Sequence, residues 1–260
     1  MNCRVLIETS TLVSASVYAV VKGVTEDFQL KHPFFEKCTD LMTFIRQHAS
    51  EDIGITTNLI EREAKHALQK AVLLEVRKKG ESAFKNFSII LNQCDDRFNG
   101  HLEVLRRDPV NQEEVNQQFV NVSRMYTDLV KTAQYLDPRR IGLRAKAAAK
   151  FQASPRYRGI KENLQRDELH AEYGQIRSLI GRKPSTNDIL IVAQAAVLSK
   201  KYRTEGVKQF FLASTDVQMS PVTDSGGNLV STGITEEIQK QFEVICDWPD
   251  RIARELRRSL

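Results

Sequence analysis

The sequence predicts an α/β fold: a parallel sheet flanked by helices, with a largely helical insertion in the middle of the chain. Three observations lead to this prediction. Short apolar runs, typical of buried strands, lie only near the two ends of the chain. Hydrophobic residues between them recur at helical spacing, and acidic residues stand where strands and helices should meet. With 260 residues, of which 41% are hydrophobic, the chain can build a sizeable core.

The strand signals are brief apolar runs bounded by turn residues. They cover residues 5–7, 54–56, 209–213 and 242–246. Runs of this length and composition are typical of buried strands. We expect no strand in the middle of the chain.

Helical spacing is clearest at residues 115–136, where hydrophobic residues recur at alternating steps of four and three. Pro109 precedes this segment and Pro138 follows it, and proline cannot continue a helix. We expect a helix of about 26 residues that packs within the molecule. A coiled-coil arm that joins two copies of the chain is the alternative.

Cysteine spacing and hydrophobic run lengths indicate the cellular compartment of the protein and argue against disulfides and structural zinc. The four cysteines form no Cys-x-x-Cys pair, so disulfides and structural zinc are poorly supported. The longest apolar runs, residues 12–21 and 189–198, are about half of the roughly 20 residues that a membrane span requires. No leader peptide precedes the first predicted strand. We therefore expect a cytoplasmic protein with no membrane partner.

Positive charge is concentrated in one part of the chain. The formal net charge is +5, yet residues 139–183 contain twelve Lys or Arg against four Asp or Glu, a local +8. Such a segment suits a polyanion, although it is also typical of a solvated helical face. Within it, residues 153–159 read as a loop in which arginines flank a tyrosine that could stack on a base. The candidate nucleic-acid-binding residues are Arg139, Arg140, Arg144, Lys146, Arg156, Tyr157 and Arg158.

Glu8 and Glu63 follow the first two predicted strands. Glu8 ends the first apolar run, at the carboxyl end of a strand, where open α/β sheets bind their ligands. Alternatively, Glu8 only interacts favourably with the N-terminus of the next helix. Glu63 lies on a helix that Thr57 or Asn58 can cap. About 200° of helix rotation separates it from Glu61, so only one of the two can face a cleft, and we prefer Glu63.

Asp188 and Asp216 complete a set of four acids. Asp188 stands in the first turn of a predicted helix, where Ser185 and Asp188 also resemble a capping box. Asp216 follows the strand of residues 209–213, where Thr215 and Asp216 could also cap a turn. Hydrolysis of a phosphodiester by bound divalent metal needs several carboxylates that converge on one cleft. Four acids at the ends of successive elements favour one shared site.

This order of acids resembles the PIN domain family of metal-dependent ribonucleases. Four strings carry the resemblance, at residues 5–13, 57–64, 187–195 and 212–216. The resemblance implies a nuclease domain of residues 1–75 and 184–250, an inserted helical region of residues 76–183, and a helix end at residues 251–260. It also implies that one or two Mg²⁺ or Mn²⁺ ions are held by Glu8, Glu63, Asp188 and Asp216. Thr9, Ser10 and Thr215 would give these carboxylates polar support.

Two features depart from the family pattern. The first acid is Glu8 where the family normally has aspartate, and its extra methylene moves the carboxylate outward. Octahedral Mg²⁺ tolerates such displacement poorly, so activity could be low or lost. The second departure is the long separation between Glu63 and Asp188, which contains the basic segment.

The sequence therefore predicts a divalent-metal-dependent ribonuclease that acts on RNA. The alternative is a catalytically impaired PIN-like module whose helical insertion binds RNA or a protein, or forms a homodimer. Phosphatases of the haloacid dehalogenase type need two aspartates after the first strand, where this chain has Glu8 and Ser10. Zinc hydrolases are not supported, because the five histidines form no His-x-x-x-His or His-Glu-x-x-His string.

Overall fold

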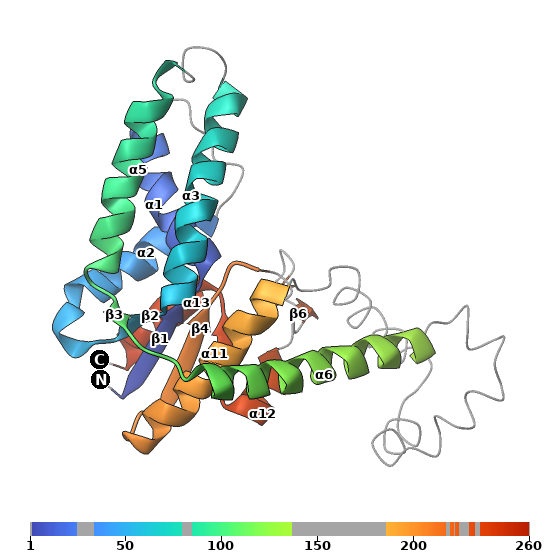
Figure 1. Ribbon diagram of the computed structural model, residues 1–260. Coiled ribbons are helices and arrows are strands. Elements are labelled where there is room, and N and C mark those ends of the chain that lie inside the picture. Colours follow the sequence, from blue (N-terminus) through green and yellow to red (C-terminus); the bar gives the residue numbers. More distant parts are fainter. Residues whose placement is uncertain are drawn as a thin grey trace, which may run out of the picture.

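The computed structural model of the chain describes residues 2–24, 34–79, 85–136, 186–216, 219–220, 222–223, 229–231 and 235–259. Helices cover both faces of a central sheet (Figure 1). The predicted α/β class is therefore confirmed. Among the described residues, none of the helices is long and apolar enough to cross a membrane.

The sheet has five strands in the order β3-β2-β1-β4-β7, and every neighbouring pair is parallel. The strands are β1 (Cys3–Ile7), β2 (Gly54–Thr56), β3 (Arg106–Arg107), β4 (Gln209–Ala213) and β7 (Ile245–Asp247). β1 is the central strand. Its side chains are apolar because helices cover both faces of the sheet, so residues on either side of the strand are buried. A separate antiparallel pair consists of β5 (Val222–Thr223) and β6 (Leu229–Ser231).

Five helices cover one face of the sheet. They are α1 (Thr9–Val24), α2 (Phe34–Gln47), α3 (Asn58–Lys79), α5 (Phe87–Leu102) and α13 (Pro249–Arg258), and a 3-10 turn, η1 (Ala49–Glu51), follows α2. Alternate residues of β1, among them Val5 and Ile7, point into the core beneath these helices. In Figure 1, α3 and α5 lie side by side and extend beyond the sheet.

Three helices lie on the opposite face: α6 (Gln112–Leu136), α11 (Thr186–Thr204) and α12 (Thr235–Phe242). Leu6 of β1 and Leu212 of β4 point into this second core. Residues 191–199 of α11 are all buried, because α11 lies between the sheet and α6. Val115 and Val122 of α6 pack within the molecule, as the sequence led us to expect for the start of this helix.

The expectation of no strand in the middle of the chain is wrong. β3 lies within residues 76–183 and pairs with β2, with Ile55 opposite Arg106 and Thr56 opposite Arg107. Two exposed arginines make up this strand, so it has no apolar run that a sequence pattern could reveal. The division into a nuclease domain and an inserted helical region stays a prediction.

A buried polar cluster ties β3 to α11. Asp108, directly after β3, is only 3% exposed and accepts hydrogen bonds from the Tyr202 hydroxyl and, at 3.0 Å, from Lys201 Nζ. Burial, and then the bond to Asp108, raise the pKa of Tyr202 above its usual range, so this hydroxyl keeps its proton. Buried polar groups satisfied in this way fix one packing arrangement.

We expect Tyr202→Phe to lower the free energy of unfolding by about 2 kcal/mol, because the variant loses a hydrogen bond to a charged group. The ring itself and its stacking on Phe210 are retained. Urea denaturation of the variant beside the wild type measures the difference. Equal stability would mean that the bond to Asp108 contributes nothing to the fold.

Candidate active site

The carboxyl ends of β1 and β4 bring Glu8 and Asp216 to the same edge of the sheet. Ile7 lies opposite Ala213 in the register, and the Glu8 amide donates to the Ala213 carbonyl at 3.3 Å. The Ser214 hydroxyl accepts from the Asp216 amide at 3.0 Å. The Asp216 carbonyl in turn accepts from the amides of residues 219 and 220, so a turn holds Asp216 just beyond β4.

A short hydrogen-bond chain links Glu8 to the segment that carries Asp216. The Ser10 hydroxyl donates to Glu8 Oε2. Ser10 Oγ accepts from the Thr215 hydroxyl at 2.7 Å and from the Thr215 amide at 3.2 Å. Because Ser10 receives both Thr215 donors, its own hydrogen is directed to Glu8. Two of the residues that the sequence suggested as polar support thus lie in one network with Glu8.

Glu63 joins the N-termini of α1 and α11. Thr9 Oγ1 donates to Glu63 Oε2 and Asn187 Nδ2 donates to Glu63 Oε1, each at 3.1 Å. Glu61 instead pairs with Arg107 at 2.9 Å. The structure thus places Glu63, rather than Glu61, beside the neighbours of Glu8 and Asp188. Their separation around the helix explains why one residue faces the site and the other faces β3.

Glu8 is a buried carboxyl group among like charges. Its side chain is 4% exposed. Burial raises the pKa of Glu8 to about 7, the Ser10 hydrogen bond opposes this rise, and the negative charges of Asp188 and Asp216 add to it. Asp188, in the first turn of α11, is therefore within electrostatic reach of Glu8 although it lies 180 residues away in the sequence. The fold therefore brings Asp188 and Asp216 within electrostatic reach of Glu8, and it holds Glu63 on Thr9 and Asn187, which adjoin Glu8 and Asp188 in the sequence.

The residues at this edge suit a divalent cation by their chemistry. Carboxylate oxygens are the donors that Mg²⁺ and Mn²⁺ prefer. Glu8 is also desolvated among negative charges, and a cation would offset them. Glu8, Asp188 and Asp216 are the residues that would hold such an ion, and Glu63 stays a predicted ligand. However, within the described ranges no group of three or more His, Cys, Asp or Glu side chains is arranged so that it could hold a metal ion.

Sequence reasoning missed three polar residues of this region. Asn187 binds Glu63, Ser214 binds the amide of Asp216, and Gln194 accepts a 2.6 Å hydrogen bond from Thr57 Oγ1. Thr57 also caps α3, since its hydroxyl accepts from the Ile60 amide. Asn187 directly precedes Asp188, and Ser214 stands two residues before Asp216. Their proximity to predicted acids in the sequence could therefore have identified them. Gln194 lies within an apolar run of α11 and gave none.

The predicted nucleic-acid-binding residues, Arg139 to Arg158, lie outside the described residues. Comparisons of the chain with protein-family models, with curated proteins and with solved structures give no significant match.

Proposed function

We propose that this protein is a PIN-like, divalent-metal-dependent ribonuclease that hydrolyses RNA phosphodiester bonds. One observation supports the proposal: beyond the carboxyl ends of β1 and β4, where α/β proteins bind their ligands, Asp188 and Asp216 lie within electrostatic reach of Glu8, and Glu63 binds the neighbouring Thr9 and Asn187. The five-stranded parallel sheet is compatible with a PIN-like fold.

The neighbours of Glu8 and Glu63 would prepare these two acids for the reaction. Glu8 loses its proton near pH 7, so it is available as a ligand in neutral or alkaline solution. Ser10 and Thr215 orient it, and Thr9 and Asn187 hold Glu63 in place. A bound divalent ion would supply charge that offsets the phosphate and activates water for attack. The basic segment of residues 139–183 would hold the flanking phosphates.

The test is incubation of the purified protein with fluorescent single-stranded RNA in Mn²⁺, in Mg²⁺ or in EDTA. An Asp188→Asn, Asp216→Asn double variant is the matched control, because it keeps the shape of both side chains and removes both charges. We expect cleavage that requires metal and is absent from the variant. Cleavage that persists in EDTA or in the double variant would overturn the proposal.

A second candidate is a PIN-like module that binds RNA or protein without turnover. Two observations favour it. The His, Cys, Asp and Glu side chains of the described residues form no group of three that could hold a metal ion, and the Ser10 hydroxyl already donates a hydrogen bond to Oε2 of Glu8. In the same assay, this candidate predicts binding without cleavage. That binding would be unchanged in the double variant and lost when the arginines between residues 139 and 166 are neutralised.

A further inference from the structure

A polar cavity lies between α6, α11 and α12 on one side of the sheet, where α6 and α12 each contact α11 (Figure 1). Its volume is about 680 Å³, within the range of ligand sites. We call it the α11 groove. Its polar lining consists of Gln118, Asn121, Lys200, Arg203, Thr204, Lys240, Gln241 and Glu243. Neither the acid site nor the proposed chemistry uses these residues.

Positive charge predominates in the α11 groove, with three cations against one acid. Lys200 is exposed, and no ion pair links it to any side chain in the part of the chain that the structure describes. Among the described residues, the Arg203 side chain forms an ion pair with Glu243, whose carboxylate lies 2.8 Å from the Arg203 Nε. The amides of Gln118, Asn121 and Gln241 add neutral hydrogen-bond donors. Cations and amides together are the groups that bind the phosphate and sugar oxygens of a nucleic-acid strand.

Glu243 occupies a position that normally favours glycine. It directly follows α12 with φ of 56°, in the left-handed region. Its carbonyl accepts a 3.0 Å hydrogen bond from the buried Ser199 hydroxyl, a contact that glycine would retain. Unlike glycine, glutamate at this position supplies a carboxylate that pairs with the Arg203 guanidinium. Both side chains of this pair are partly exposed, 39% and 54%, so a phosphate can compete for the guanidinium.

We propose that the α11 groove binds the phosphodiester backbone of single-stranded RNA. Lys200, Arg203 and Lys240 contact phosphates, and Glu243 competes with the RNA for Arg203. The identity of the ligand rests on the proposed ribonuclease function. α11 carries Asp188 in its first turn and Lys200 twelve residues later, about 18 Å along the helix. A strand of several nucleotides can therefore contact the acid site and the α11 groove together.

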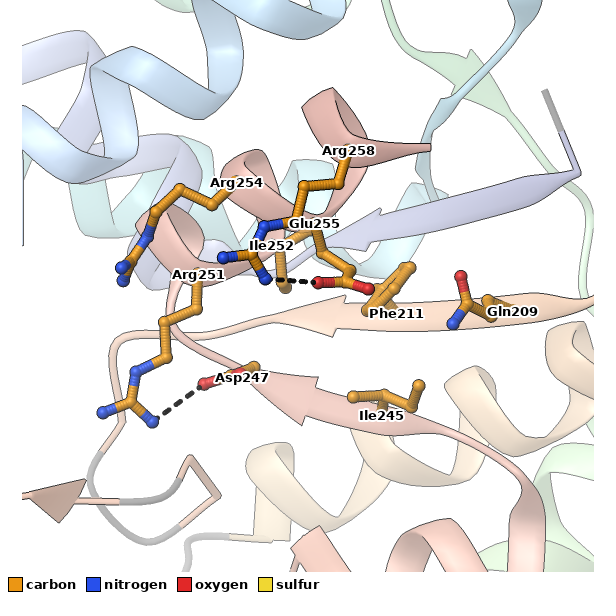
Figure 2. Close-up of a pocket in the computed structure, with 9 residues that line it drawn as sticks. All are labelled: Gln209, Phe211, Ile245, Asp247, Arg251, Ile252, Arg254, Glu255 and Arg258. Atoms are coloured by element: carbon orange, nitrogen blue, oxygen red, sulfur yellow. Dashed lines mark ion pairs between the residues drawn. The ribbon is translucent and has the colours of Figure 1, made fainter. Parts of the chain in front are cut away.

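A further pocket of the described residues is less suited to a polyanion. It measures about 380 Å³ and lies where α13 meets β4 and β7 (Figure 2). Its three arginines each face an acid: Arg251 pairs with Asp247, Arg254 with Asp250, and Arg258 with Glu255. The positive charge of that pocket is therefore largely offset.

The test measures binding of a short fluorescent single-stranded RNA in EDTA, where cleavage is absent, over a series of salt concentrations. We expect Lys200→Ala to weaken binding about fivefold near 0.1 M salt and to reduce the slope of log K against log salt by about 0.7, because one phosphate contact is lost. Glu243→Gly should tighten binding and steepen the slope. Lys70→Ala, which removes an exposed charge from α3 on the opposite face, should change neither.

Three results would overturn the proposal. The first is unchanged binding in both groove variants, and the second is weaker binding of Lys200→Ala with an unchanged salt slope. The third is equal, Lys200-dependent binding of polyglutamate, because the groove would then take acidic chains in general. Cleavage of a dinucleotide in Mn²⁺ separates this proposal from the ribonuclease itself. A dinucleotide is too short to reach the groove, so we expect Lys200→Ala to cleave it at the wild-type rate. If even the wild type cleaves no RNA while the salt-slope changes are found, the ribonuclease fails and the groove stands.

Discussion

Glu8→Gln is expected to stabilise the folded protein at pH 8 by about 3 kcal/mol in EDTA, and to lower RNA cleavage in Mn²⁺ by about 100-fold. The stability effect follows from the pKa of Glu8, which is raised from 4.5 to about 7 by burial and by the charges of Asp188 and Asp216. A carboxyl group whose pKa rises on folding favours the folded state below pH 4.5. This contribution is lost as the pH rises through 7. Glutamine is neutral at every pH and can still accept the Ser10 hydrogen bond.

Urea denaturation of wild type and variant at pH 8 and at pH 4.5 measures this effect. The variant should be more stable at pH 8, and the advantage should largely vanish at pH 4.5, where Glu8 is protonated. Glu63→Gln is the matched control. Both Glu63 oxygens accept hydrogen bonds, so an amide there loses one of them, and we expect about 1 kcal/mol of destabilisation. A Glu8→Gln variant as unstable as Glu63→Gln would contradict the burial argument.

The combination of greater stability with lost activity would be informative about function. A buried charge among like charges destabilises the metal-free protein, and residues with only a structural role rarely do so. A variant that gains stability and keeps full cleavage would instead show that Glu8 has no part in the reaction. Stability and activity measured on one protein sample therefore decide whether this carboxyl group is functional.

The fold was predictable where burial produces a pattern and unpredictable where it does not. β1, β2 and β4 are apolar because helices cover both faces of the sheet, and the sequence located all three. β3 consists of two exposed arginines. It joins the sheet through backbone pairing with β2 and through the Asp108–Tyr202 contact, which links residues 94 positions apart. Neither leaves a local pattern in the sequence.

The candidate site shows the same division. The position of each acid at the end of a strand or the start of a helix was evident from the sequence, because the neighbouring residues define those ends. Which acid of the Glu61 and Glu63 pair faces the others depends on the roll of α3 against the sheet. The sequence favoured Glu63, but the orientation itself is set by packing and by the pair between Arg107 and Glu61, which joins distant parts of the chain. The pKa of Glu8 likewise depends on Asp188 and Asp216, which are distant in sequence.

His101 is expected to lower the stability of the protein in acid by about 3 kcal/mol between pH 6.5 and pH 4. This α5 side chain is 7% exposed, and within the described residues neither ring nitrogen forms a hydrogen bond of ordinary geometry. Burial, with help from Arg46 and Arg97, lowers the pKa of His101 from 6.5 to about 4. A histidine whose pKa falls on folding contributes stability above pH 6.5. That contribution is lost as the pH falls toward 4, because the unfolded chain takes up the proton first.

His101→Leu should remove this loss, and urea denaturation across pH 4 to 7.5 measures it. The exposed His66 provides the control for replacing a histidine, since His66→Gln removes no buried contact and should leave the stability at pH 7.5 unchanged. As the pH falls from 6.5 to 4.5, the Glu8 contribution to the free energy of unfolding rises and the His101 contribution falls. The two changes nearly cancel in the wild type. Stability should therefore fall with decreasing pH in Glu8→Gln and rise in His101→Leu. Identical pH profiles for the two variants would contradict both assignments, because each variant isolates a shift of opposite sign.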